Sequence, residues 1–268
     1  NVVSGSPVTL SINDAGNTYL DIEAGAAVLS AAISVGLDSL TQAMNALDTA
    51  VTNLEGVAGS DFYVSNTGDL ILGNAGSVTG ITATRSIEID TTGSLSVQED
   101  VSSTGLNSSS DHKYLELTAE SISVDATIST SKLKTRLLAD RTIVLNSGSS
   151  LITIDGGIQL TANSYGNEAG NFTGIEADNA SIVSTGAGYI TMSGYAGDDA
   201  ASDGLYGINL HSGTVVSSTA TGAVTMSGHG GDGGRGDASR HGPGVATALD
   251  GHDVEDLDHA RDRAQQTE

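Results

Sequence analysis

The sequence contains no cysteine, no tryptophan and only two prolines among its 268 residues. The absence of cysteine excludes a disulfide framework, and with it the class of small disulfide-stapled secreted domains. Aromatic residues make up only 3% of the chain, so the rings that supply much of the buried area in ordinary globular cores are scarce. A core without them needs narrow layers of Val, Ile, Leu and Ala, a condition that the stacked coils of a solenoid meet.

Basic residues are scarce as well. Ten Lys and Arg stand against 33 Asp and Glu, which gives a formal net charge of −23. Nucleic acids and anionic membrane surfaces would repel such a chain, so we expect neither as a partner. The sequence has no apolar run long enough to span a membrane. Because it begins with Asn1 rather than Met, we expect it to be part of a longer parent chain.

Residues 1–59 show two different apolar patterns. Apolar and polar side chains alternate over residues 1–25, which is typical of a strand. Ser39 and Gln42 then fit a helix capping box, and Gly56 fits the residue that ends a helix. We interpret residues 1–59 as strands plus an amphipathic helix that caps or joins the fold; a coiled-coil partner helix is the alternative. The helical spacing is carried by Leu40, Met44, Leu47, Val51 and Leu54.

Residues 60–228 form the body, in which apolar-x-apolar doublets recur between turns rich in Gly, Ser, Thr, Asn and Asp. Each doublet would point two side chains to the same side of a short strand. The spacing is too short for intervening helices, which disfavours a βαβ fold and leaves a sandwich or a solenoid. The doublets include Leu70/Leu72, Ile87/Ile89, Leu95/Val97, Leu115/Leu117, Ile122/Val124, Ile143/Leu145, Ile152/Ile154 and Ile158/Leu160.

A repeat decides between these two folds. The segment Gly174–Gly194 recurs as Gly207–Gly228, and the second copy is one residue longer than the first. A weaker copy precedes them, because Ile158–Leu160 aligns with Ile190–Met192 and then with Val224–Met226. The two copies begin 33 residues apart, and a fixed period of this length indicates stacked structural units. We therefore predict an all-β fold, a single-stranded parallel β-helix, and expect it to be right-handed as crossovers between parallel strands are.

The doublets, the polar turns and the phrases Val183-Ser184-Thr185-Gly186 and Thr191-Met192-Ser193-Gly194 resemble those of filamentous haemagglutinin-like exoproteins. The resemblance covers residues 60–228 and includes no catalytic motif. It implies a right-handed β-helix shaft of a large bacterial surface or secreted adhesin. The expected function is structural and adhesive rather than enzymatic. The expected location is extracellular or on the cell surface, and the expected partners are host or environmental surfaces, glycans or other cells.

Acidic turns provide the candidate metal ligands. Asp198, Asp199 and Asp203 lie in the loop after the Ile190–Met192 segment, and Asp232 lies at the matching place one repeat later. Carboxylates clustered in turns can bind Ca²⁺, which takes six to eight oxygen ligands. The simpler interpretation is a solvated polar loop, because acidic turns occur throughout the chain. A Ca²⁺-binding matrix or S-layer-like protein is therefore an alternative function, and no other cofactor is expected.

The segment Lys132-Leu133-Lys134-Thr135-Arg136 is the one cationic stretch of the body. Polysaccharide lyases on β-helices use a basic residue beside a stabilised carboxylate, and Asp125 and Asp140 lie near in sequence. This makes a carbohydrate-active enzyme a second alternative. The simpler interpretation is the outward face of a strand whose inward residue is Leu133, and no aromatic platform for a sugar is evident nearby.

Residues 229–268 differ from the body. They hold four of the six His and four of the seven Arg, and the repeat ends at Gly228. We predict a charged, disordered tail rich in Gly, Asp and His.

Overall fold

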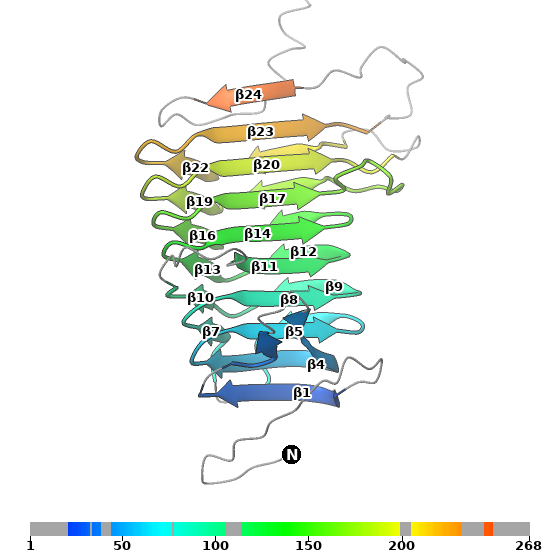
Figure 1. The fold of residues 1–268 in the computed structure, drawn as a ribbon. Helices are drawn as coiled ribbons and strands as arrows, with labels where there is room; N and C mark the ends of the chain where they lie inside the picture. The colour runs from blue at the N-terminus through cyan, green and yellow to red at the C-terminus, as the bar shows by residue number, and fades with distance from the viewer. Residues whose placement is uncertain are drawn as a thin grey trace, which may run out of the picture.

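The computed structural model describes residues 21–32, 34–38, 44–76, 78–105, 114–198, 205–231 and 244–248. These residues form one 22-stranded sheet that winds upwards as a solenoid, together with a small two-stranded hairpin, as Figure 1 shows. Every pairing within the large sheet is parallel except the last one, between β23 and β24. The chain is therefore a parallel β-solenoid, as the repeat predicts. The described residues contain no helix that is long and apolar enough to cross a membrane.

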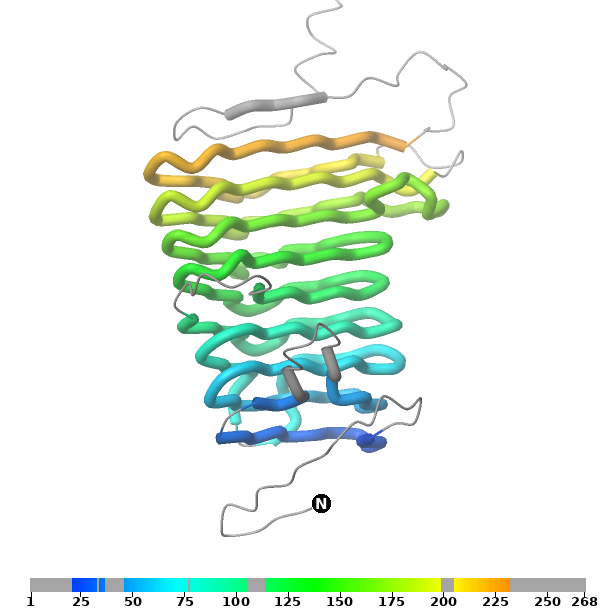
Figure 2. The backbone as a smooth tube through the Cα atoms, viewed as in Figure 1, coloured from blue at the N-terminus to red at the C-terminus, as the bar shows by residue number. Residues whose placement is uncertain are grey.

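The strands fall into three ladders, one for each side of the coil, which we call faces A, B and C (Figure 2). Face A contains β5 (Phe62–Asn66), β8 (Ile87–Thr91), β11 (Tyr114–Ala119), β14 (Lys134–Ala139), β17 (Ile158–Ala162), β20 (Ile190–Tyr195) and β23 (Val224–His229). Face B contains β6 (Leu70–Leu72), β9 (Ser94–Val97), β12 (Ser121–Val124), β15 (Ile143–Leu145), β18 (Ile175–Asp178) and β21 (Ile208–His211). Face C contains β7 (Ile81–Ala83), β10 (Val101–Ser103), β13 (Thr127–Thr130), β16 (Ser150–Thr153), β19 (Ser181–Ser184) and β22 (Val215–Ser218).

The predicted helix at residues 39–55 is wrong over its described part, where the structure has strands instead. Leu47–Ala58 forms β4, and Met44–Asn45 (β3) pairs with Leu37–Asp38 (β2) as a hairpin. Leu47, Thr49 and Val51 also follow a period of two, and all three are buried. The coils on both sides supply hydrogen bonds along β4, and this tertiary pairing overrides the helical spacing. Residues 39–43 lie outside the described part of the chain.

The N-terminal strands extend the solenoid rather than covering its end. β1 (Ile22–Ala31) pairs in parallel with β4, and β4 pairs in turn with β5, β6 and β7. β4 thus forms most of one coil without a break. β1 and β4 therefore share one sheet with the body that begins at residue 60.

The core is filled by aliphatic side chains that alternate inward along each strand. Seven of the eight predicted doublets point inward and are buried, as Leu115/Leu117 and Ile158/Leu160 illustrate. The exception is the doublet Ile152/Ile154, whose side chains are 37% and 51% exposed. Leu151 points inward in its place, because it lies in register between Ile128 and Ile182.

The register confirms the repeat residue by residue. Ile175 pairs with Ile208, and Ile190 pairs with Val224, so the two copies of the repeat stack directly on each other. Met192 lies between Leu160 and Met226, as the alignment of the weaker copy predicts. Lower in the stack the coils are shorter, since the step along the chain from Leu115 to its partner Thr135 is smaller than that from Ile175 to Ile208. The loops absorb this difference while the strands keep their stacking.

The corner between faces C and A is built from stacked hydroxyls and glycines. Ser103, Thr130, Thr153 and Ser184 occupy equivalent inward positions in successive coils. Thr130 Oγ1 donates to Thr153 Oγ1 at 3.1 Å, and Thr153 Oγ1 accepts the Gly156 amide at 2.9 Å. These bonds satisfy backbone and hydroxyl groups that would otherwise be buried without partners.

Glycine is required at this corner because consecutive coils approach closely. A Cβ at Gly188 would lie 1.8 Å from the carbonyl oxygen of Gly156, and a Cβ at Gly222 would lie 1.9 Å from that of Gly188. Either contact would push the backbones apart.

The predicted tail contains one strand that the sequence analysis missed. Gly244–Ala248 forms β24, which lies antiparallel on β23 at the upper end of Figure 1. Residues 232–243 and 249–268 lie outside the described part, so the rest of the predicted tail stays a prediction.

Candidate functional site on face A

The lower outer surface of face A carries an open depression. Its floor comes from β5, β8 and β11, and Ala46 contributes from the segment before β4. In one outward row Tyr63, Glu88 and Glu116 follow one another in successive coils. Parallel pairing thereby brings together side chains that lie far apart in the sequence. The lining residues are Ala46, Tyr63, Val64, Ser65, Glu88, Asp90, Glu116 and Thr118.

The depression is acidic: Glu88 and Glu116 are partly buried, whereas Asp90 is exposed at its rim. Glu88 and Glu116 are directly adjacent in register, an arrangement of like charges that costs stability. Desolvation by burial raises the pKa of Asp90, and the nearby Asp140 carboxylate raises it further. Burial also raises the pKa of Glu116, although the Arg136 guanidinium opposes this shift. Both carboxyl groups therefore hold a proton more readily than an exposed carboxyl does.

The basic segment lies directly above this depression. Leu133 and Thr135 are 2% and 1% exposed, which confirms that Lys132, Lys134 and Arg136 alternate on the outward side. Arg136 forms an ion pair with Glu116 and lies 5.1 Å from the ring centroid of Tyr114. The guanidinium is thus committed to neighbours on both sides, which disfavours it as a proton-accepting base.

Aromatic rings flank the basic segment, contrary to the expectation that none lies nearby. Lys134 Nζ lies 5.6 Å from the ring centroid of Tyr189, which is 42% exposed. Lys134 and Tyr189 are distant in sequence, but only the small Gly157 separates them along their row of face A. A Cβ on Gly157 would come within 2.7 Å of the Tyr189 ring, so this glycine makes room for the aromatic side chain. Only the coil register could have revealed this group.

The carboxylates suggested as lyase partners have other contacts. Asp125 Oδ1 accepts a hydrogen bond from Asn146 Nδ2 at 2.9 Å on the B side of the coil. Asp140 lies near Asp90, whose pKa it raises. Asp125 is therefore engaged on another side of the coil, and Asp140 lies near the acidic depression.

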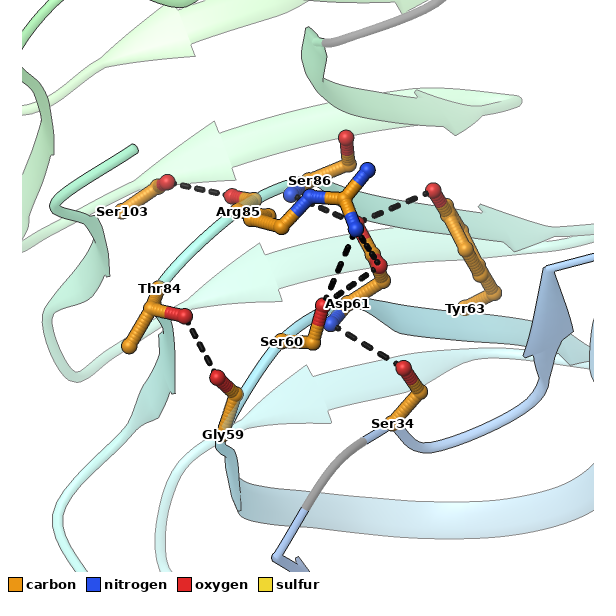
Figure 3. A network of polar contacts seen from close by, with 9 residues as sticks. All are labelled: Ser34, Gly59, Ser60, Asp61, Tyr63, Thr84, Arg85, Ser86 and Ser103. Carbon is orange, nitrogen blue, oxygen red and sulfur yellow. Dashed lines mark hydrogen bonds and ion pairs between the residues drawn. The ribbon is translucent and has the colours of Figure 1, made fainter. Parts of the chain in front are cut away.

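A buried polar network binds three coils together near the start of face A, as Figure 3 shows. The Asp61 side chain is 2% exposed and forms an ion pair with Arg85 at 3.4 Å. Asp61 Oδ1 also accepts the Ser86 amide at 3.1 Å, and Asp61 Oδ2 accepts the Ser60 hydroxyl at 2.8 Å. The Asp61 amide donates to Ser34 Oγ of the coil below. This carboxylate is a structural clamp, because its lone pairs are used by the protein itself.

Of the four predicted Ca²⁺ ligands only Asp198 lies among the described residues, so the calcium site stays a prediction. Asp198 lies beside Ala169 in an isolated bridge, and its carbonyl oxygen accepts the Gly170 amide at 3.4 Å. Asp199, Asp203 and Asp232 lie outside the described residues. Within the described ranges, no group of three or more His, Asp or Glu side chains is placed to hold a metal ion.

Comparisons with known proteins add no relative. No family model matches the chain, and no curated protein and no solved structure matches it either.

Proposed function

We propose that the chain is a structural and adhesive shaft segment of a large exported bacterial surface protein. The unbroken, in-register ladder that runs from β1 to β23 carries this proposal, because it makes a stiff rod from one repeated unit. The resemblance to filamentous haemagglutinin-like exoproteins supports it. In this proposal the solenoid is right-handed, as parallel crossovers are by default.

The outer surface fits a role in display. Above the basic segment, face A presents uncharged polar side chains in two rows, including Gln159, Thr191 and Thr225 in one row and Thr161 and Ser193 in the other. Such rows offer hydrogen bonds to a glycan or to another cell surface. The net charge of −23 keeps the rod soluble and disfavours nucleic acid as a ligand.

An adhesion assay tests this proposal. Beads coated with the full chain should be retained by cells or immobilised glycans, and soluble full chain should compete for this retention. Beads coated with a heat-unfolded chain serve as the control. Equal retention by folded and unfolded chains, or none on any surface, would contradict an adhesive role.

A carbohydrate-active enzyme is the second candidate, and the depression on face A favours it. Glu116 is partly buried and Asp90 is exposed, and both carboxyl groups have raised pKa values on a surface open to a polymer. Release of sugars from acidic polysaccharides with Ca²⁺ present should then be lost in Asp90→Asn and Glu116→Gln. Loss in Lys132→Ala, Lys134→Ala and Arg136→Ala instead would point to the basic segment. Activity lost in either set, with the fold retained, would overturn the non-enzymatic proposal.

A Ca²⁺-binding matrix protein would use Asp198 with the acidic turns around it. Calorimetric titration of the full chain with millimolar Ca²⁺ separates this function from the shaft. Heat that disappears in Asp198→Asn would support it, and no heat would end it.

A further inference from the structure

The last coil is covered on one face and open on the other two. On face A, Val224 and Met226 of β23 are 8% and 5% exposed. On face B, every residue of β21 is only partly buried, and on face C Val216 of β22, the inward residue that stacks on the buried Ile182, is also only partly buried. β24 lies over β23 alone, which accounts for the difference between the faces.

β24 also differs from the other strands of the large sheet in its direction. It runs antiparallel to β23 over five residue pairs, from Val224–Ala248 to Gly228–Gly244. An antiparallel strand cannot begin a further coil of the same solenoid, so it ends the ladder on this face. Pro243 directly precedes it, and proline is a residue that natural proteins use to protect sheet edges.

The edge beneath β24 is suited to pairing with another strand. β23 has the sequence Val-Thr-Met-Ser-Gly-His and contains no Lys, Arg, Asp or Glu, the charged residues that usually block edge-to-edge association. Its sequence is nearly self-complementary about Met226. Two antiparallel copies would pair Thr225 with Ser227 and Val224 with Gly228, in the register that β24 now uses.

We propose that β24 is a stop strand, which prevents β23 from pairing with β23 of a second copy of this chain. When β24 is displaced, two copies associate through these edges about a twofold axis. Such an interface is isologous and closed, so it produces a dimer rather than a fibre. The inference does not depend on whether the chain is an adhesive shaft.

The full-length double variant Ala246→Pro/Thr247→Pro tests the proposal, because proline cannot donate the backbone hydrogen bonds of a strand. Sedimentation velocity over a concentration series should show a monomer for the unmodified chain and a monomer–dimer equilibrium for the variant. At low concentration, the amides of Val224, Met226 and Gly228, which point toward β24, should exchange faster in the variant. The matched control is Gln265→Pro/Gln266→Pro, which places two prolines outside β24 and should stay monomeric.

A charge on the edge should reverse the effect. Adding Thr225→Lys to the β24 variant should restore the monomer, whereas Thr191→Lys, in the same outward row one coil lower, should leave the dimer in place. A β24 variant that stays monomeric while its β23 amides exchange faster would overturn the proposal. Open-ended growth would overturn the twofold dimer, and an unmodified chain that already dimerises through β23 would overturn the stop strand. Circular dichroism confirms that each variant is folded.

Discussion

A middle coil and the last coil of the solenoid both turn leucines inward, but these leucines have different surroundings. Leu117, in the middle of face A, is fully buried between Ile89 and Leu137 of the neighbouring coils. Leu210 of the last coil has Ala177 below it and, among the described strands, none pairing above it, and it is only partly buried. The difference shows that an inward leucine gains its burial from the coils on both sides rather than from its own strand.

Truncation of the two leucines should show the largest difference in stability between the two coils. Leu117→Ala should lower the free energy of unfolding by about 3–5 kcal/mol, because it leaves a cavity between two coils. Leu210→Ala should cost about 1 kcal/mol, because the leucine is only partly buried and loses contacts on one side only. Urea denaturation of both variants measures the two values. Equal losses would mean that the end of the solenoid is covered as well as its middle.

Two glycines allow the same comparison between an inner coil and an end strand to be made for the backbone. Gly188→Ala should cost about 2–3 kcal/mol, the upper range for overpacking, because its Cβ would meet the Gly156 carbonyl oxygen. Gly25→Ala, in the end strand β1, should change stability by less than about 1 kcal/mol, since no atom lies within 4 Å of its Cβ. Thermal melting of both variants checks this. A Gly188→Ala variant as stable as the unmodified chain would show that the corner backbone can move aside.

Polar groups buried between coils should likewise contribute more to the free energy of unfolding than polar groups on the surface. Asp61→Asn should cost about 2 kcal/mol, because the buried carboxylate serves Arg85, Ser60 and Ser86 at once. Glu120→Gln should cost less than about 0.5 kcal/mol, because its ion pair with Arg141 is exposed on both sides. Chemical denaturation of the two variants provides the test. Similar losses would show that Asp61 contributes no more to stability than an ordinary surface ion pair does.

The fold could be predicted from the sequence where the pattern of residues was local or repeated. Apolar doublets and the repeat that ends at Gly228 were enough to predict a parallel solenoid, and even the stacking of Met192 under Met226. The prediction was wrong at β4, because the spacing of Leu47 and Val51 fits periods of two and of 3.6 alike, and only the neighbouring coils decide between strand and helix. It was also wrong at Ile152/Ile154, where a shift of one residue exchanges the inward and outward sides.

The candidate site was harder to predict, because it is built by register across coils of unequal length. Glu88 and Glu116 are adjacent in space although the coil between them is longer than the next one. Tyr189 reaches Lys134 across a coil in the same way. No single-sequence pattern encodes the loop lengths that set these neighbours.

Within face A, the acidic lower part and the neutral upper part should differ in their response to pH. Burial, and then the Asp140 carboxylate, raise the pKa of Asp90 above its ordinary value of 3.8. The folded chain therefore binds this proton more tightly than the unfolded chain does. The resulting stability is fully present below pH 3.8 and is lost as pH rises through the folded pKa.

Asp90→Asn should consequently raise the melting temperature at pH 7. The gain in the free energy of unfolding should be less than about 1 kcal/mol, because the carboxyl group is exposed to solvent. This gain should shrink as the pH is lowered. Ser193→Asn, in the same outward row of the neutral upper part, should show no such pH dependence, because neither residue titrates there. Melting curves of both variants between pH 3 and pH 7 measure the difference. A gain for Asp90→Asn that stays constant with pH would assign the effect to packing rather than to the proton. A loss of stability at pH 7 would mean that the ionised carboxylate makes a favourable contact on face A.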